Sequence, residues 1–118
     1  MSRILVADDS PDQLAVQRKL LESFGYEVDT ATSTAEAFAE IARSHPDLIV
    51  IDLGLPQPSD GLELIRRIRQ AGHREPIVVL SGWPDDIYGA PEEAMVSRVL
   101  MKGNVRELLQ VIPEILKH

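Results

Sequence analysis

The sequence contains no cysteine, few aromatic residues and no excess of positive charge. The absence of cysteine excludes disulfide bonds and thiolate-bound metal ions. With 12 basic against 19 acidic residues, the net charge is −7, so nucleic-acid binding by this domain alone is not expected. No apolar run approaches the length that is needed to cross a membrane. The negative charge would suit a metal cation or a basic partner surface, although a solvated acidic surface is the simpler explanation.

The rest of the composition is that of an ordinary globular protein. Hydrophobic residues make up 44% of the chain and charged residues 26%. A length of 118 residues suits one domain that spans residues 1–118. The first three residues lead into an apolar segment rather than a signal peptide, so we expect a cytoplasmic protein without membrane attachment.

Five short segments have the character of strands. Continuous apolar runs at 3–7, 48–51 and 77–80 are typical of strands that are covered on both faces of a parallel sheet. Residues 26–31 alternate in character, which favours a less buried edge strand. Residues 98–101 form the fifth predicted strand.

Helical patterns separate these strands. Ser10-Pro11 marks the start of the first helix, and Ser33 with Glu36 forms a capping box for the second. The third helix ends near residues 71–72, and a second capping box, Asn104 with Glu107, starts the last. Between the fourth and fifth strands, residues 83–96 contain two prolines and a glycine, so the fourth helix should be short or broken. Strand and helix alternate throughout, which predicts an α/β fold with a parallel sheet and helices on both faces.

Apolar residues at helical spacing predict which helix faces pack on the sheet. Pro113 is expected to kink the last helix or to end its regular part early. The predicted inner faces contain Val16, Leu20, Leu21 and Phe24 in the first helix; Ala35, Phe38, Ile41 and Ala42 in the second; Leu62, Ile65 and Ile68 in the third; and Val105, Leu108, Leu109, Ile112 and Leu116 in the last.

Asp52 directly follows the apolar run at 48–51, and the chain then enters a loop. Gly54, Pro56, Pro58 and Gly61 keep that loop irregular. A carboxylate at the C-terminal end of a buried parallel strand lies where open α/β sheets bind their ligands. We therefore predict that Asp52 accepts a phosphoryl group.

Further polar residues follow the other strands. Asp8 and Asp9 follow the first strand, Ser81 the fourth and Lys102 the fifth, so all should meet Asp52 at one edge of the sheet. Clustered carboxylates form an oxygen site that suits Mg²⁺, and their mutual repulsion should raise at least one pKa when no cation is bound. A nucleophile, a metal and fixed positive charge are what phosphoryl transfer requires.

Each of these residues also has a purely structural explanation. Asp9 is suited to capping a helix, and Asp8 to a solvated loop. Asp52 and Ser81 are common in turns, and Lys102 is usually solvated at a strand end. The functional interpretation is favoured because all five occur together at four strand ends.

The arrangement closely resembles the receiver domain of two-component response regulators over essentially the whole chain. The matching segments are Ile-Leu-Val-Ala-Asp-Asp at 4–9, Pro-Asp-Leu-Ile-Val-Ile-Asp-Leu-Gly-Leu-Pro at 46–56, Asp-Gly at 60–61, Val-Val-Leu-Ser-Gly at 78–82 and Leu-Met-Lys at 100–102.

The resemblance implies a flavodoxin-like sheet with strand order 2-1-3-4-5 and assigns a role to each polar residue. Asp52 would take the phosphoryl group from a phosphohistidine on a sensor histidine kinase or a histidine phosphotransfer protein. Asp9, Asp52 and the backbone carbonyl of Gly54 would ligate Mg²⁺, and Asp8 would hold a metal-bound water. Ser81 and Lys102 would bind the phosphoryl oxygens, and their movement would switch the faces near the fourth and fifth strands. A homodimer or an output domain would receive the signal.

The sequence departs from the family pattern around the fifth strand. Gly103 follows Lys102 where proline is usual, and we expect a trans bond because a cis bond before a residue other than proline costs about 2.5–4 kcal/mol. Val99 stands where an aromatic residue is usual, and Trp83 beside the site fits a packing or lid role as well as a partner contact. An altered face of this kind implies an unusual dimer, partner or signal path.

Two classes of function remain, and the first is favoured. The first is a phosphorylatable receiver that catalyses its own phosphorylation and dephosphorylation. The second is an atypical receiver that acts as a phosphorylation-independent docking module. A small phosphatase or nucleotide-binding enzyme is disfavoured, because the chain has no glycine-rich loop after the first strand and no Asp-x-Asp after the central one.

Overall fold

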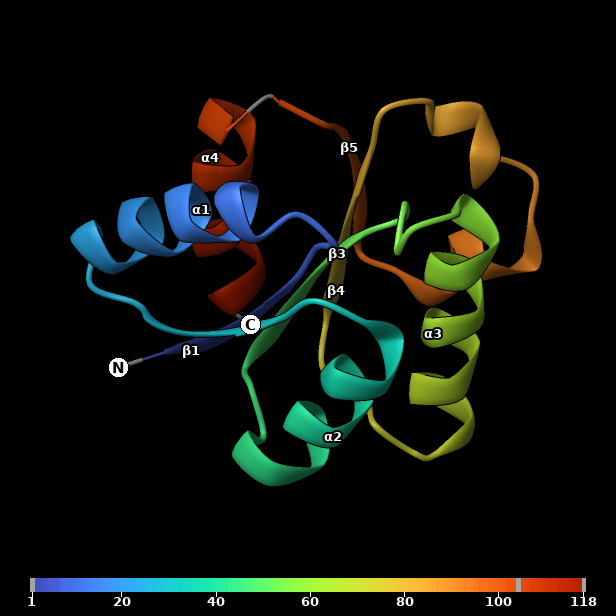
Figure 1. The fold of residues 1–118 in the computed structure, drawn as a ribbon, viewed down its shortest axis with the longest axis horizontal. Helices are drawn as coiled ribbons and strands as arrows, with labels where there is room; N and C mark the ends of the chain where they lie inside the picture. Colours follow the sequence, from blue (N-terminus) through green and yellow to red (C-terminus); the bar gives the residue numbers. More distant parts are fainter. Residues whose placement is uncertain (1, 104, 118) are drawn as a thin grey trace.

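The computed structural model describes residues 2–103 and 105–117, which form a five-stranded sheet flanked by helices (Figure 1). All paired strands are parallel, and the order is β2-β1-β3-β4-β5, as the resemblance implied. The strands are β1 (Arg3–Ala7), β2 (Glu27–Ala31), β3 (Leu48–Asp52), β4 (Ile77–Ser81) and β5 (Arg98–Met101).

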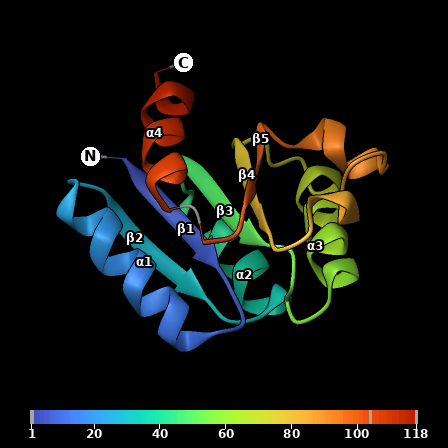
Figure 2. The same cartoon turned by 90° about the horizontal axis from the view of Figure 1, so that it is seen from above.

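The helices divide between the two faces of the sheet (Figure 2). Buried residues of α1 and α4 pack with one set of strand side chains, and those of α2 and α3 pack with the other set. The strands β1, β3 and β4 are nearly or wholly buried, which explains their unbroken apolar sequences. The helices are α1 (Pro11–Ser23), α2 (Thr34–Ser44), α3 (Pro58–Gln70) and α4 (Val105–Leu116).

The predicted break in the fourth helix is confirmed. Two short 3₁₀ turns, η1 (Pro84–Asp86) and η2 (Pro91–Met95), stand between β4 and β5. Arg66 of α3 forms an ion pair of 2.7 Å with the buried side chain of Glu92. Arg69 donates to the Met95 carbonyl from Nε at 3.1 Å and from Nη2 at 2.8 Å. These contacts from α3 hold η2 in place where backbone helix bonds are few.

The inner face of α1 differs from the prediction. Leu21 is buried as expected, and Leu14 and Gln17 join it, but Val16 and Phe24 are 62% and 61% exposed. Buried positions 14, 17 and 21 follow the three- and four-residue spacing of one helix face, which position 16 does not share. Phe24 is the C-cap residue and lies beyond the last turn.

The inner faces of α2 and α4 are partly as predicted. In α2, Ile41 is buried and Phe38 half-buried, but Ala37 takes the place that was predicted for Ala35 and Ala42, which are exposed. In α4, the predicted core residues are buried or half-buried, and the helix continues past Pro113 to Leu116, so the predicted early end is wrong.

The helix starts agree with the capping predictions where the structure describes them. The Ser10 hydroxyl accepts from the Gln13 amide at 3.3 Å, and the Ser33 hydroxyl accepts from the Glu36 amide at 3.1 Å. The Glu36 carboxylate accepts from Thr32 instead of Ser33, so the capping box is only half formed. The box predicted at Asn104 lies outside the described residues.

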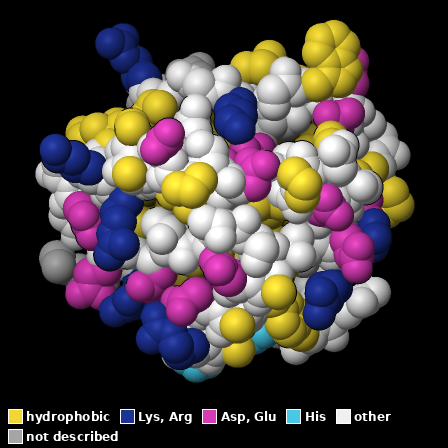
Figure 3. Space-filling model, viewed as in Figure 1, with side chains coloured by type: hydrophobic (Ala, Val, Ile, Leu, Met, Phe, Trp, Pro, Cys, Tyr) yellow, Lys and Arg dark blue, Asp and Glu magenta, His cyan; other side chains and the backbone are white. Residues whose placement is uncertain are grey.

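Charged side chains of both signs are interspersed on the face shown in Figure 3, without a continuous basic stripe there. None of the helices in the described ranges is long and apolar enough to span a membrane.

Candidate functional site

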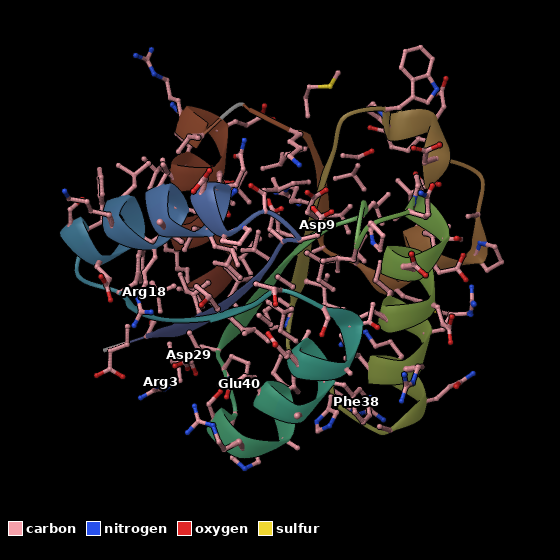
Figure 4. The ribbon with its side chains drawn as sticks, in the orientation of Figure 1. Arg3, Asp9, Arg18, Asp29, Phe38 and Glu40 are labelled. Atoms are coloured by element: carbon pink, nitrogen blue, oxygen red, sulfur yellow. The ribbon has the colours of Figure 1, made fainter. Side chains whose placement is uncertain are left out.

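The polar residues predicted to meet at one sheet edge do so. Asp8 follows β1, Asp52 ends β3, Ser81 ends β4, and Lys102 follows β5. Pairing aligns these ends: Asp52 lies opposite Leu80, one residue before Ser81. Figure 4 places Asp9 where these strand ends converge, apart from Arg3 and Asp29, whose 2.9 Å ion pair lies elsewhere on the sheet.

Three carboxylates from two neighbouring strands form a cluster that could hold a cation. One oxygen from each of Asp8, Asp9 and Asp52 lies within 4.8 Å of the other two. Asp8 and Asp52 are buried, while Asp9 is exposed and leaves the cluster open to solvent. Among the described residues, Oδ2 of Asp8 is buried without a hydrogen-bond partner, which is costly unless a ligand satisfies it. Hard carboxylate oxygens and an open side are suited to Mg²⁺ with bound water.

The Lys102 amine points into this acid cluster. Its Nζ lies 2.5 Å from Oδ2 of Asp52 and 3.9 Å from Oδ2 of Asp8. Burial on its own lowers the pKa of Lys102, but the hydrogen bond to Asp52 and the charges of Asp52, Asp8 and Asp9 outweigh it and raise the pKa overall. The amine is therefore a fixed positive charge beside Asp52.

Ser81 and Gly54 complete the surroundings of Asp52. The buried Ser81 hydroxyl accepts from the Trp83 amide at 3.1 Å, which leaves its own hydrogen available to an anion. The Gly54 amide donates to Oδ1 of Asp52 at 3.1 Å and fixes the carboxylate. Both residues line a cavity of about 320 Å³ together with Asp52 and Lys102.

Several residues of this cavity were not predicted as site residues. The loop after β3 contributes Leu53 and Pro56, the first residue of α3 contributes Pro58, and η1 contributes Asp86, whereas Trp83 was expected beside the site. Trp83 is 65% exposed, so it is a wall of the cavity and not a core residue. Asp86 lies in the stretch that sequence patterns left irregular, where no strand end marked its position.

The departure at Gly103 has the expected result. The Lys102–Gly103 bond is not cis, and Leu55–Pro56 is the cis bond of the described chain. Gly103 has a φ of +93°, a conformation that glycine adopts without strain. The loop after Lys102 therefore has a trans bond and a left-handed glycine where the family usually has a Lys-Pro pair. Lys102 still contacts Asp52.

We expect Asp8→Asn to raise the Tm of the metal-free protein at neutral pH. Burial, and to a smaller extent the charge of Asp52, raises the pKa of Asp8 above its ordinary value. A carboxyl group with a raised folded pKa binds its proton more tightly in the folded state, so stability falls as the pH rises from about 4 through that pKa. Asparagine removes this loss.

Thermal unfolding with and without Mg²⁺ checks this expectation. The advantage of the variant should shrink as the pH falls and vanish below about 4, where Asp8 is protonated in both the folded and the unfolded state of the wild type. Added Mg²⁺ should raise the Tm of the wild type more than that of the variant. Asp12→Asn, an exposed acid on α1, is the control and should change little. Equal Tm values for Asp8→Asn and wild type at neutral pH would contradict the destabilising effect of the buried Asp8 charge.

The fold and the site together define a class of signalling domain, in which an aspartate at the end of the third of five parallel strands lies among two further acids, a serine and a lysine. The family model described as the response regulator receiver domain matches residues 4–112. The chain belongs to this family and is a receiver domain of two-component signal transduction.

Relatives from bacterial signalling systems agree with this assignment. The chain is 39% identical over 93 residues to the virulence transcriptional regulatory protein PhoP of Salmonella typhimurium, which covers 74% of this chain and 40% of PhoP. It is 36% identical over 74 residues to the sensor protein EvgS of Escherichia coli, which covers 63% of this chain and 6% of EvgS. The chain thus spans less than half the length of either relative.

Solved receiver structures share the whole fold. The response regulator TrrA of Thermotoga maritima, in complex with Mg²⁺ and a beryllofluoride, has a TM-score of 0.86 at 27% identity and covers 98% of this chain and 99% of its own. The chemotaxis regulator CheY4 of Vibrio cholerae has a TM-score of 0.84 at 27% identity and covers 98% of each chain.

Proposed function

We propose that this receiver domain accepts a phosphoryl group on Asp52 in a Mg²⁺-dependent reaction. The observation that carries the proposal is the 2.5 Å contact between the Lys102 amine and Asp52, inside a cluster of three acids. A carboxylate that served only as a turn residue would have no need of a half-buried ammonium and two neighbouring acids.

The site residues divide the chemistry among them. Asp9, Asp52 and the Gly54 carbonyl would hold Mg²⁺, and Asp8 would hold a water bound to it. The ion supplies positive charge against the phosphoryl oxygens when it is bound. The acid cluster in this chain and the Mg²⁺ in the TrrA structure support that assignment.

Transfer is a displacement at phosphorus. An oxygen of Asp52 attacks, the bond from phosphorus to the donor histidine breaks, and the nitrogen keeps the electron pair. The Lys102 ammonium then moves from the carboxylate to a phosphoryl oxygen, and the Ser81 hydroxyl donates to another. Hydrolysis later returns Asp52 to a carboxylate and releases inorganic phosphate.

The partners follow from this chemistry. The donor would be a sensor histidine kinase or a histidine phosphotransfer protein, in a cytoplasmic setting. Movement of Ser81 and Lys102 would shift the ends of β4 and β5, where Met101 is 51% exposed and available to a dimer or an output domain. No observation on the described residues favours the phosphorylation-independent docking module.

Incubation with acetyl phosphate and Mg²⁺, followed by intact-mass measurement, tests the proposal. We expect a single phosphoryl adduct on the wild type and none when a chelator removes the metal. Asp52→Asn should give no adduct, whereas the control Asp12→Asn should label like the wild type. A wild-type protein without an adduct, and without a response to beryllofluoride, would favour the docking module.

A further inference from the structure

One wall of the acceptor cavity comes from η1, the first of the two 3₁₀ turns after β4. Its residue Asp86 lines the cavity of about 320 Å³ that also contains Asp52, Ser81 and Lys102. Asp86 is the only acid of that lining besides Asp52, and it is not among the three acids of the cation cluster. A negative residue in the wall of a site for a negative group requires an explanation.

The Asp86 carboxylate is available for a ligand. Asp86 is half-buried, and within the described residues its side chain has neither a hydrogen bond nor an ion pair. Only its backbone amide is engaged, donating to the Trp83 carbonyl at 3.0 Å. The other polar side chains of the cavity have assigned partners: Lys102 contacts Asp52, and Ser81 accepts from Trp83.

The neighbouring acid Asp85 lacks this placement. It is exposed and is not part of the cavity lining. Successive residues of a 3₁₀ turn project about 120° apart, so adjacent side chains point in different directions. The turn therefore separates two chemically identical residues, one that lines the cavity and one that does not.

We propose that Asp86 orients the water that hydrolyses the phosphoryl group on Asp52, and thereby sets the lifetime of the phosphorylated state. The inference rests on the proposed function of Asp52. A cavity of this size has room for a phosphoryl group and a water, whose share of liquid volume is about 30 Å³.

In this step the water oxygen attacks phosphorus while Asp86 accepts a hydrogen bond from the water and takes its proton. The bond between phosphorus and the Asp52 oxygen breaks, and the electron pair returns to the carboxylate. Inorganic phosphate leaves, and Asp86 releases the proton to solvent. The attacking water needs a group that can accept its proton. Lys102 is charged and has no lone pair for this purpose, whereas the Asp86 carboxylate has one.

Adduct decay in Asp86→Asn tests the inference. The wild type and the variant are loaded with acetyl phosphate and Mg²⁺, the donor is removed, and the adduct is followed by intact mass. General-base contributions are about 10²–10⁴-fold, and asparagine still accepts a hydrogen bond through its carbonyl oxygen, so we expect decay that is about tenfold slower. Asp86→Glu should restore decay to near the wild-type rate.

Two controls separate a role in hydrolysis from a change of the pocket. Asp85→Asn removes the same charge from the same turn and should decay within about twofold of wild type. Beryllofluoride is not hydrolysed, so its affinity, read from the fluorescence of the single tryptophan Trp83, should be unchanged in Asp86→Asn.

The outcomes distinguish this inference from the function it rests on. Wild-type protein that forms no adduct overturns the proposed function and this inference with it. An adduct that decays equally fast in Asp86→Asn and wild type overturns the inference alone. Equal slowing in Asp85→Asn also overturns it, because that result traces the effect to general charge. A matching loss of beryllofluoride affinity in Asp86→Asn overturns it too, because that result traces the effect to a change of the pocket.

Discussion

Replacing Gly61 with alanine is expected to destabilise the domain by about 3 kcal/mol, which is the upper part of the usual range for overpacking. A Cβ at this position would lie 2.5 Å from the Leu53 carbonyl oxygen and 2.6 Å from the Leu53 Cα. The close approach exists because the Gly61 amide donates to that carbonyl at 3.2 Å. Alanine gains about 1 kcal/mol in helix propensity, which does not offset the clash.

Urea unfolding at fixed pH measures this effect, and Gly82→Ala is the control. A Cβ at Gly82 meets no atom within 4 Å, so we expect a change of less than about 1 kcal/mol there. Because Leu53 follows the acceptor, a Gly61→Ala protein that folds should also label more slowly with acetyl phosphate. Stability of Gly61→Ala at or above that of Gly82→Ala would contradict the packing of α3 on the acceptor loop.

Lys102→Met is expected to slow adduct formation from acetyl phosphate about 10²-fold. Loss of one fixed donor to a developing negative charge typically costs about 10²–10³-fold. The Lys102 amine is such a donor, because it is held within 2.5 Å of the accepting carboxylate and its raised pKa keeps it charged. Methionine fills a similar volume without the charge.

The time course of intact mass at saturating Mg²⁺ measures the rate for Lys102→Met. Lys19→Met removes an exposed lysine from α1 and should label within about twofold of wild type. Full-rate labelling of Lys102→Met would show that the ammonium only balances the resting charge of Asp52 and takes no part in transfer.

The sequence predicted the sheet because its strands are buried on both faces. The runs at 4–7, 48–51 and 77–80 are continuously apolar, and a strand in the middle of a parallel sheet requires that pattern. The same regularity placed the site: a polar residue directly after such a run must lie at the C-terminal edge of the sheet. Asp52 and Lys102 meet for this reason, although 50 residues separate them.

Helix faces were predicted less well, because alanine and valine are tolerated on exposed faces. Val16 and Ala42 fit an apolar stripe in the sequence, yet they face solvent. Gln17, a polar residue, is buried instead. Packing against the sheet decides which apolar face of a helix turns inward. When two faces of a helix are similarly apolar, the sequence alone does not show which of them is buried.

The remaining site residues depend on tertiary approach. Gly61 was expected in the loop and lies instead in α3, where the contact with Leu53 demands a residue without a side chain. Asp86 reaches the cavity through a 3₁₀ turn that is held by the buried Ile87 beside it. The Asp-Gly pair at 60–61 marked Gly61 as part of the family pattern, but the contact with Leu53 that requires glycine is visible only in the folded chain. Asp86 follows no strand end and has no motif, so the sequence did not mark it.

Locating the adduct tests the central claim most directly. Reduction of an acyl phosphate with borohydride converts the modified aspartate to homoserine, which peptide sequencing by mass spectrometry identifies. We predict homoserine at position 52 after treatment with acetyl phosphate and Mg²⁺, and unmodified aspartate at positions 8, 9 and 86. Homoserine at one of those three positions, with Asp52 intact, would contradict the assignment of Asp52 as the acceptor.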